Sequence, residues 1–299
     1  MRSGRFSIRL QPAGDAARVL SWIEDHPLPL GDYAEAAVDW LTTHLQFLFD
    51  WIQAVLSAFI EAILFVLAEP HPLVVVAGFG ILAFLLRRRI APVLLTVGGL
   101  LLIINLGYWK ETTETLALVI ASTAVCMAVG VPVGIAAARR PWLDAGLRPV
   151  LDLMQTIPTF VYLIPALILF GLGLVPGLVA TVIFALPAPI RLTKLGIAST
   201  PLQLQEAGDA FGATPMQRLL KIEIPHALPQ IMAGLTQTIM LSLSMVVIAA
   251  LVGAPGLGVP VVRALNTINI GNGFEAGLAI VLLAIILDRF FHIDDRHAR

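Results

Sequence analysis

The sequence is poor in charged residues and in cysteine. Of its 299 residues, 13% are charged and 58% are hydrophobic, whereas a soluble domain carries about 25% charged residues. The single cysteine, Cys126, lies in an apolar run, so neither a disulfide framework nor a cysteine-based metal site is expected. The first thirty residues lack a long apolar core with a small-residue cleavage site, so we expect no signal peptide. These features predict an all-α, polytopic membrane protein, and the net charge of −1 gives no indication of nucleic-acid binding.

Motifs for ATP hydrolysis and for common catalytic centres are also missing. The chain contains no Gly-Lys-Ser or Gly-Lys-Thr, no Gly-x-Ser-x-Gly and no His-Glu-x-x-His, and its six histidines are scattered. We therefore expect no catalytic residue, no bound cofactor and no metal. Because few ionisable groups interrupt the apolar stretches, coupling by a buried proton relay is disfavoured. A channel or an ion-coupled carrier that works without an ATPase remains the alternative class of function.

Seven apolar stretches approach the roughly 20 residues that a helix needs to cross the bilayer core. If the polar loop 196–230 is cytoplasmic, 13 of the 19 Lys and Arg residues face the cytoplasm, as the positive-inside rule requires. Seven spans would place the N-terminus outside. The predicted domains are 1–69, an N-terminal arm with an amphipathic helix, and 70–299, a transmembrane domain. The predicted spans are 71–86, 90–108, 114–138, 150–172, 175–194, 231–252 and 274–290.

The stretch 45–68 is apolar enough to insert into a membrane but is interrupted by acids. Its polar residues recur at spacings of three and four, which places them on one face of a helix; they are Asp50, Gln53, Ser57 and Glu61. That pattern favours a helix lying in the membrane interface. The alternative is an eighth span, which would place the N-terminus inside.

The polar segment 200–229 carries two copies of one helix-start signal. Residues 200–203 and 214–217 both begin with Thr-Pro and end with Gln, which predicts a capping box in each. Gly212 lies between them, where a first helix must end. Pro225 and Pro229 limit the second helix. We therefore predict helix, sharp turn, helix, with the helices over about 201–211 and 215–224.

This segment resembles the cytoplasmic loop of ABC-importer permeases, whose pattern is Glu-Ala-Ala, three residues, Gly, nine residues, Ile, one residue, Leu-Pro. Two positions depart from the pattern, with Gly for the second Ala and Ile for Leu. The stretches 154–193 and 241–258 look like permeases of glycine betaine, proline betaine and choline importers, and the resemblance covers about 108–289. The residues of this coupling loop that match or replace the family pattern are Glu206, Ala207, Gly208, Gly212, Ile222 and Pro225.

The resemblance implies a permease core in the bacterial inner membrane, an ATP-binding subunit on a separate chain and an extracytoplasmic substrate-binding protein. It also implies a second copy of the permease, giving a homodimer. The hairpin would bind a groove on the ATPase, where the small residues Ala207 and Gly208 would allow close approach. Glu206 would either pair with a basic group of that partner or be an ordinary surface acid.

A polar stripe predicts where the substrate passes. In the predicted span 150–172, polar or small residues recur at steps of three and four, and so share one helical face; they are Asp152, Gln155, Thr159, Tyr162 and Ala166. A weaker stripe contains Gln237, Met240 and Ser244. Polar groups inside a bilayer need a partner or water. The stripes therefore predict either a pathway with Gln155, Thr159, Tyr162, Gln237 and Ser244 in its lining, or hydrogen bonds between packed helices.

Overall fold

The computed structural model describes residues 29–291, and every regular element within that range is a helix. The chain divides into two compact units, 1–46 and 47–299. Helix α2 (Leu30–Ala68) passes through the boundary, and Leu45 just before it has non-helical backbone angles (φ −119°, ψ 16°). Within the second unit, Ile60 and Leu67 of α2 are buried in the apolar core. Placement of 45–68 in the membrane interface and the domain boundary at residue 69 remain predictions.

The remaining helices all lie in the second unit. Among the described residues, five helical stretches are long and apolar enough to cross a membrane, and α3 and α4 are shorter apolar helices of 16 residues each. Short connections join most consecutive helices. In chain order the elements are α3 (Pro72–Arg87), α4 (Ile90–Asn105), α5 (Trp109–Arg139), α6 (Pro141–Thr156), α7 (Thr159–Phe170), α8 (Leu174–Ala185), α9 (Pro187–Ala198), α10 (Leu202–Ala210), α11 (Pro215–Arg218), the π-helix η1 (Leu219–Glu223), α12 (Ile224–Ala250), α13 (Gly258–Asn266) and α14 (Ile270–Phe291).

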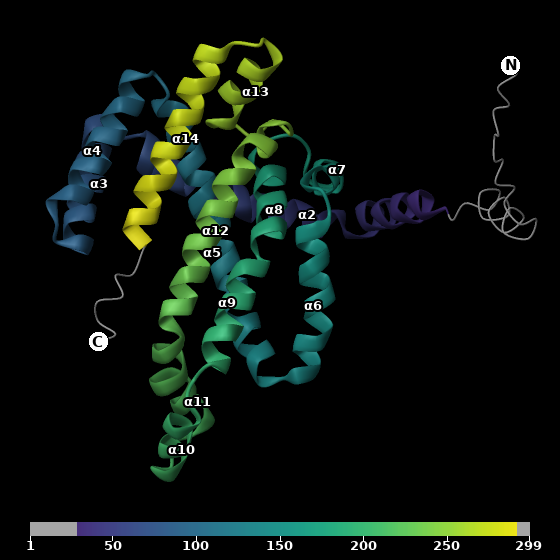
Figure 1. The fold of residues 1–299 in the computed structure, drawn as a ribbon. Helices are drawn as coiled ribbons and strands as arrows, with labels where there is room; N and C mark the ends of the chain where they lie inside the picture. Colours follow the sequence, from purple (N-terminus) through teal and green to yellow (C-terminus); the bar gives the residue numbers. More distant parts are fainter. Residues whose placement is uncertain (1–28, 292–299) are drawn as a thin grey trace, which may run out of the picture. The chain divides into compact units, whose positions relative to one another are not determined.

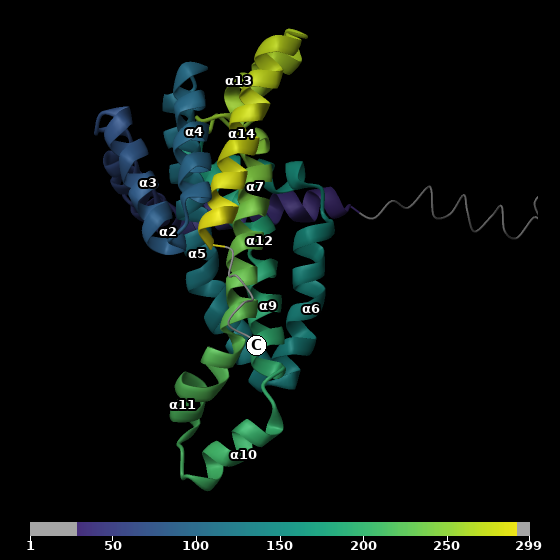
Figure 2. The same ribbon diagram turned by 60° about the vertical axis from the view of Figure 1, so that its left-hand side comes forward.

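Helix α9 packs between α5 and α12, and this trio forms the centre of the unit (Figure 1). A side chain at Gly134 of α5 would lie 2.7 Å from the carbonyl oxygen of Ile190, so only glycine permits this helix approach. The pair α3–α4 lies on one side of the trio and α6 on the other, in both views (Figure 2). The hairpin α10–α11 extends from one end, and α13 lies at the opposite end.

The predicted span 150–172 is divided between two helices, so the single helical face expected along it is wrong. Helices α6 and α7 meet at an angle of 95°. The chain turns at Ile157, whose backbone is extended (φ −63°, ψ 130°) because the next residue, Pro158, disfavours helical angles in the residue before it. Pro165, in contrast, sits inside α7 without ending it.

Two basic helix ends that the sequence analysis assigned to the same side of the membrane lie together. The Nε of Arg87, at the end of α3, donates a hydrogen bond of 2.7 Å to the carbonyl oxygen of Arg289, near the end of α14. The ends of helices 202 residues apart in sequence therefore meet.

Candidate functional site

The polar segment folds into helix, turn and helix. Helix α10 ends at Ala210 with Phe211 as its cap, and Gly212, the next residue, has a positive φ of 75°. The amide of Gly212 donates to the carbonyl oxygen of Asp209 at 2.9 Å, and that of Ala213 donates to Gly208 at 3.0 Å. These bonds satisfy carbonyl groups that the end of a helix leaves free. The turn therefore depends on a left-handed residue at position 212.

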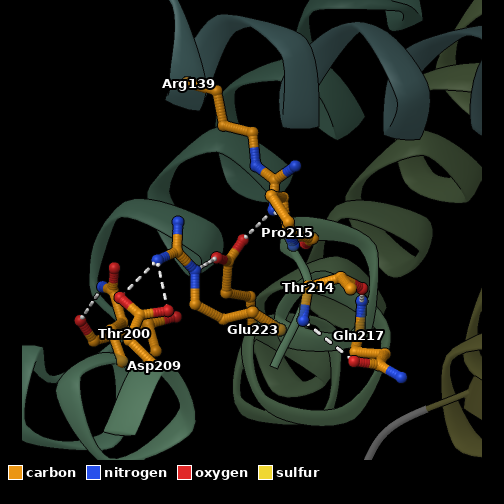
Figure 3. Close-up of polar contacts among 9 residues, drawn as sticks. Arg139, Thr200, Asp209, Thr214, Pro215, Gln217 and Glu223 are labelled. Carbon is orange, nitrogen blue, oxygen red and sulfur yellow. Dashed lines mark hydrogen bonds and ion pairs between the residues drawn. The ribbon is translucent and has the colours of Figure 1, made fainter. Parts of the chain in front are cut away.

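Only the second expected capping box forms. The hydroxyl of Thr214 accepts the amide of Gln217 at 3.3 Å, and the Gln217 side chain accepts the amide of Thr214 at 2.8 Å (Figure 3). Helix α10 begins one residue later than expected, with Pro201 as its cap and no side-chain cap bond. The first box is therefore wrong, and Gln205 instead donates its side-chain amide to the Thr200 carbonyl at 3.0 Å.

The expected end of the second helix near Pro225 is also wrong. Helical structure continues without a break from Pro215 to Ala250, through η1. Proline cannot donate the hydrogen bond that an α-helix requires. Here the wider turns of η1 precede Pro225, and the amide of Ile224 donates to the Leu219 carbonyl five residues earlier. The π-helix thus lets the hairpin run directly into the long helix α12.

Two motif residues of the coupling loop contact one another. Gly208 is the one buried residue of α10, and a Cβ built there would lie 2.6 Å from Cδ1 of Ile222. The absence of a side chain at position 208 therefore permits packing inside the hairpin, whereas we expected it to allow close approach of a partner. Ala207, Glu206, Gly212 and Pro225 are exposed.

A buried acid that the sequence analysis did not single out connects the hairpin to α5. The side chain of Glu223 is 5% exposed, and its Oε2 accepts a bond of 2.8 Å from Nη2 of Arg139, at the end of α5. Its Oε1 accepts from Nε of Arg218 at 3.1 Å, and Arg218 also binds Asp209 of α10 at 2.9 Å. Figure 3 shows Glu223 reaching Arg139 through one of these bonds. The hydrogen bond to Glu223, followed by the charge of Asp209, raises the pKa of Arg218 above its ordinary value.

Sequence offered only a partial signal for this cluster. An acid between Ile222 and Ile224 is unusual on a helix that becomes apolar, but nothing local indicates its partner. Arg139 lies 84 residues away. Within residues 29–291, no three His, Cys, Asp or Glu side chains gather closely enough to hold a metal ion.

The predicted pathway residues lie on three different helices. Gln155 lies on α6, where its side-chain oxygen accepts a bond of 3.1 Å from Arg191 of α9. Arg191 also binds Asp152 at 2.5 Å, and Lys194 pairs with Asp144. These charged groups line a hollow of about 440 Å³ between α6 and α9.

The hydroxyl of Tyr162 is already used within the chain. It donates to the carbonyl oxygen of Met154 and lies 2.9 Å from that of Ile157. In an unbroken helix the Met154 carbonyl would bind the amide of residue 158, which is proline and has none. Tyr162 therefore bridges the bend between α6 and α7, and its ring is buried.

The other predicted lining residues face outward or are half-buried. Gln237 and Ser244 are exposed on α12, and Thr159 at the start of α7 is half-buried. The Ser244 hydroxyl donates to the Met240 carbonyl one turn earlier, at 3.0 Å. The single face expected for Asp152 through Ala166 does not exist, because the 95° bend divides these residues between two helices.

The model of the family "Binding-protein-dependent transport system inner membrane component" matches residues 130–299, which include the hairpin and α12. The chain belongs to this family. It is 48% identical to the glycine betaine transport system permease protein OpuAB of Bacillus subtilis over 88% of this chain and 93% of that protein. It is 43% identical to the glycine betaine/carnitine transport permease protein GbuB of Listeria monocytogenes, over 91% of this chain and 97% of that protein.

Solved structures show the same fold. A chain of the MetNI methionine ABC transporter, in an inward facing conformation, matches with a TM-score of 0.54 and 26% identity. The match covers 59% of this chain and 89% of that chain. The protein is therefore a multi-pass inner-membrane permease component of an ABC importer, as the sequence resemblance implied.

Proposed function

We propose that this permease passes quaternary-ammonium osmoprotectants such as glycine betaine, proline betaine or choline. The observation that carries the substrate class is the close similarity to permeases named for glycine betaine, including the Escherichia coli glycine betaine/proline betaine permease ProW at 41% identity over 91% of this chain. An extracytoplasmic binding protein would select the cargo, holding its quaternary ammonium group in an aromatic cage through cation–π attraction. A second copy of this chain would complete the pathway as a homodimer.

The hairpin α10–α11 is proposed as the contact with a separate ATP-hydrolysing subunit. Phe211 at its tip is 93% exposed, and an exposed apolar patch is typical of a surface that binds a partner. Leu202 and Met216 add exposed apolar surface on either side. A well-packed aromatic residue is a common source of binding energy at an interface. Phe211 would therefore insert into a groove of the ATPase, and the exposed Glu206 and Ala207 would lie against its rim.

The pathway is proposed to contain Gln155, Thr159, Gln237 and Ser244, with Tyr162 at the bend. Exposure of Gln237 on a helix in the bilayer supports this, because lipid cannot satisfy its side-chain amide. Ion-paired walls near Gln155 suit a zwitterion, which carries both charges and gains little from a wall of one sign. Weak, distributed contacts would release the cargo as readily as they admit it.

Reconstitution tests the function. The chain is placed in liposomes with the ATPase and the binding protein of its transport system, and uptake of radiolabelled glycine betaine is measured with and without internal ATP. We expect uptake only with all three proteins and ATP. Uptake by this chain alone would instead establish a channel or an ion-coupled carrier.

Cysteine accessibility tests the pathway. In a Cys126→Ala background assembled with the ATPase, single cysteines at 155, 159, 237 and 244 should react with a small water-soluble thiol reagent. Cysteines at the exposed apolar positions 161 and 164, which we expect to face lipid, should not. Reactivity should change when ATP is trapped. Equal protection at all positions in every nucleotide state would show that the polar residues only pack between helices.

A further inference from the structure

The hairpin is connected to the membrane helices in two ways. Its two ends are covalent connections, since residues 199–201 join α9 to α10, and α11 and η1 continue directly into α12. Its side contacts α5, where Glu223 binds Arg139 and the nearby Leu219 and Ala227 pack in one cluster with Val131 and Ile135. A partner that pulls on the tip of the hairpin would move α9 and α12 through the covalent connections. It would move α5 through this side contact and through the packing of α5 against α9 and α12.

The ion pair between the hairpin and α5 is directional, and its acid, Glu223, is buried. Glu223 is shared between Arg139 of α5 and Arg218 of α11, and Arg218 in turn binds Asp209 of α10. Two acids and two arginines balance, so the chain of bonds joins four elements, α5, η1, α11 and α10, without leaving a net charge. Sliding α5 past η1 would leave one oxygen, Oε2, of a carboxylate that is nearly inaccessible to water without its donor, which opposes that motion. An apolar contact alone would permit such sliding.

We propose that Glu223 and Arg139 are positioning residues that make α5 move together with the hairpin when the ATPase closes. Neither residue touches cargo or ATP. The pair makes α5 follow the hairpin together with α12, which continues from it covalently, so that the pathway opens each time ATP is hydrolysed. This inference rests on the proposed docking of the hairpin on the ATPase.

The experiment compares Glu223→Gln and Arg139→Gln in the full complex of permease, ATPase and binding protein, reconstituted in liposomes. Three quantities are measured: ATPase retained on purification, ATP hydrolysed, and glycine betaine taken up. For each variant we expect normal retention of the ATPase and continued hydrolysis. Uptake per ATP should fall by roughly 5- to 10-fold, in the range of a typical coupling between two sites. The double variant should be no worse than either single one, because both changes break the same bond.

The matched control is Glu69→Gln, which makes the same chemical change at an exposed acid between α2 and α3. It should leave uptake per ATP unchanged. Normal uptake per ATP in both Glu223→Gln and Arg139→Gln would overturn the inference, as would loss of bound ATPase in both, which assigns the pair to folding alone. Failure of the proposed docking would be distinct, because the unmutated chain would then retain no ATPase.

Discussion

Two four-residue stretches of the hairpin carry the same signal and fold differently. Residues 214–217 form a complete capping box, in which the side chains of Thr214 and Gln217 each accept an amide of the other residue. Residues 200–203 form none, although they too read Thr-Pro-x-Gln. Side-chain chemistry is the same in both, so the difference arises from what precedes each threonine.

Thr200 belongs to the hydrogen-bonded turn that ends α9. Its amide donates to the carbonyl oxygen of Ile197 at 3.3 Å, and the residue is only 5% exposed. Its hydroxyl is buried without a hydrogen-bond partner among the described residues. Thr214 instead follows the exposed turn at Gly212 and is free to take the extended backbone of a helix cap (φ −67°, ψ 158°). The Thr-Pro-x-Gln sequence therefore forms a capping box only where the residues before it leave the threonine free to adopt the backbone angles of a helix cap.

The largest expected effect comes from removing the turn that frees Thr214. We predict that Gly212→Val abolishes glycine betaine uptake and weakens retention of the ATPase. A Cβ at this position meets nothing within 4 Å, so the whole effect comes from the backbone, whose φ is 75°. A left-handed conformation costs an ordinary residue roughly 1–2 kcal/mol, and a β-branched residue more. Uptake and ATPase retention are measured on protein expressed at the normal level.

Gly212→Asn is the matched control, because asparagine tolerates left-handed angles and also adds a side chain. It should retain most of the uptake. Normal uptake from a well-expressed Gly212→Val protein, or equal loss in the asparagine variant, would show that the left-handed turn is not what matters.

A smaller effect should follow from breaking the one box that forms. Thr214→Val keeps the shape of the side chain but removes the oxygen that accepts the Gln217 amide. Loss of such a cap costs about 1 kcal/mol. Hydrogen exchange of the amides at 216–218, measured by mass spectrometry, should therefore accelerate about fivefold. An unchanged exchange rate would mean that the box contributes nothing to the stability of α11.

The features that the sequence could predict are those caused by residues close together in the chain. Gly212 predicted a turn, because only a few residues tolerate left-handed angles, and long apolar runs predicted α5, α12 and α14. The bend at Ile157 had a local signal in Pro158, but its size depends on Tyr162 bonding back across the break. The helix running through Pro225 could not be predicted, because a π-turn removes the usual penalty.

The central contact of the site, between Arg139 and Glu223, could not be predicted from the sequence. The Arg139–Glu223 bond joins the end of α5 to η1, and it depends on the packing of α5 and α12 against each other and against α9. Packing of Gly134 against Ile190 sets part of that spacing. A pattern read along the chain contains no distance between helices, so neither the partner of Glu223 nor its burial could be derived from it.

The smallest effect is expected at the first threonine, and it is the sharpest test of the comparison. Thr200→Val makes the same change as Thr214→Val, but here it removes a buried hydroxyl that has no partner among the described residues. Replacing an unsatisfied polar group by an apolar one of the same shape is nearly neutral or stabilising. Exchange at 203–205 should therefore stay the same or slow by a factor of about two to five, equivalent to at most about 1 kcal/mol. Faster exchange, comparable to that of Thr214→Val, would mean that Thr200 caps α10 after all, and that identical local signals do fold alike.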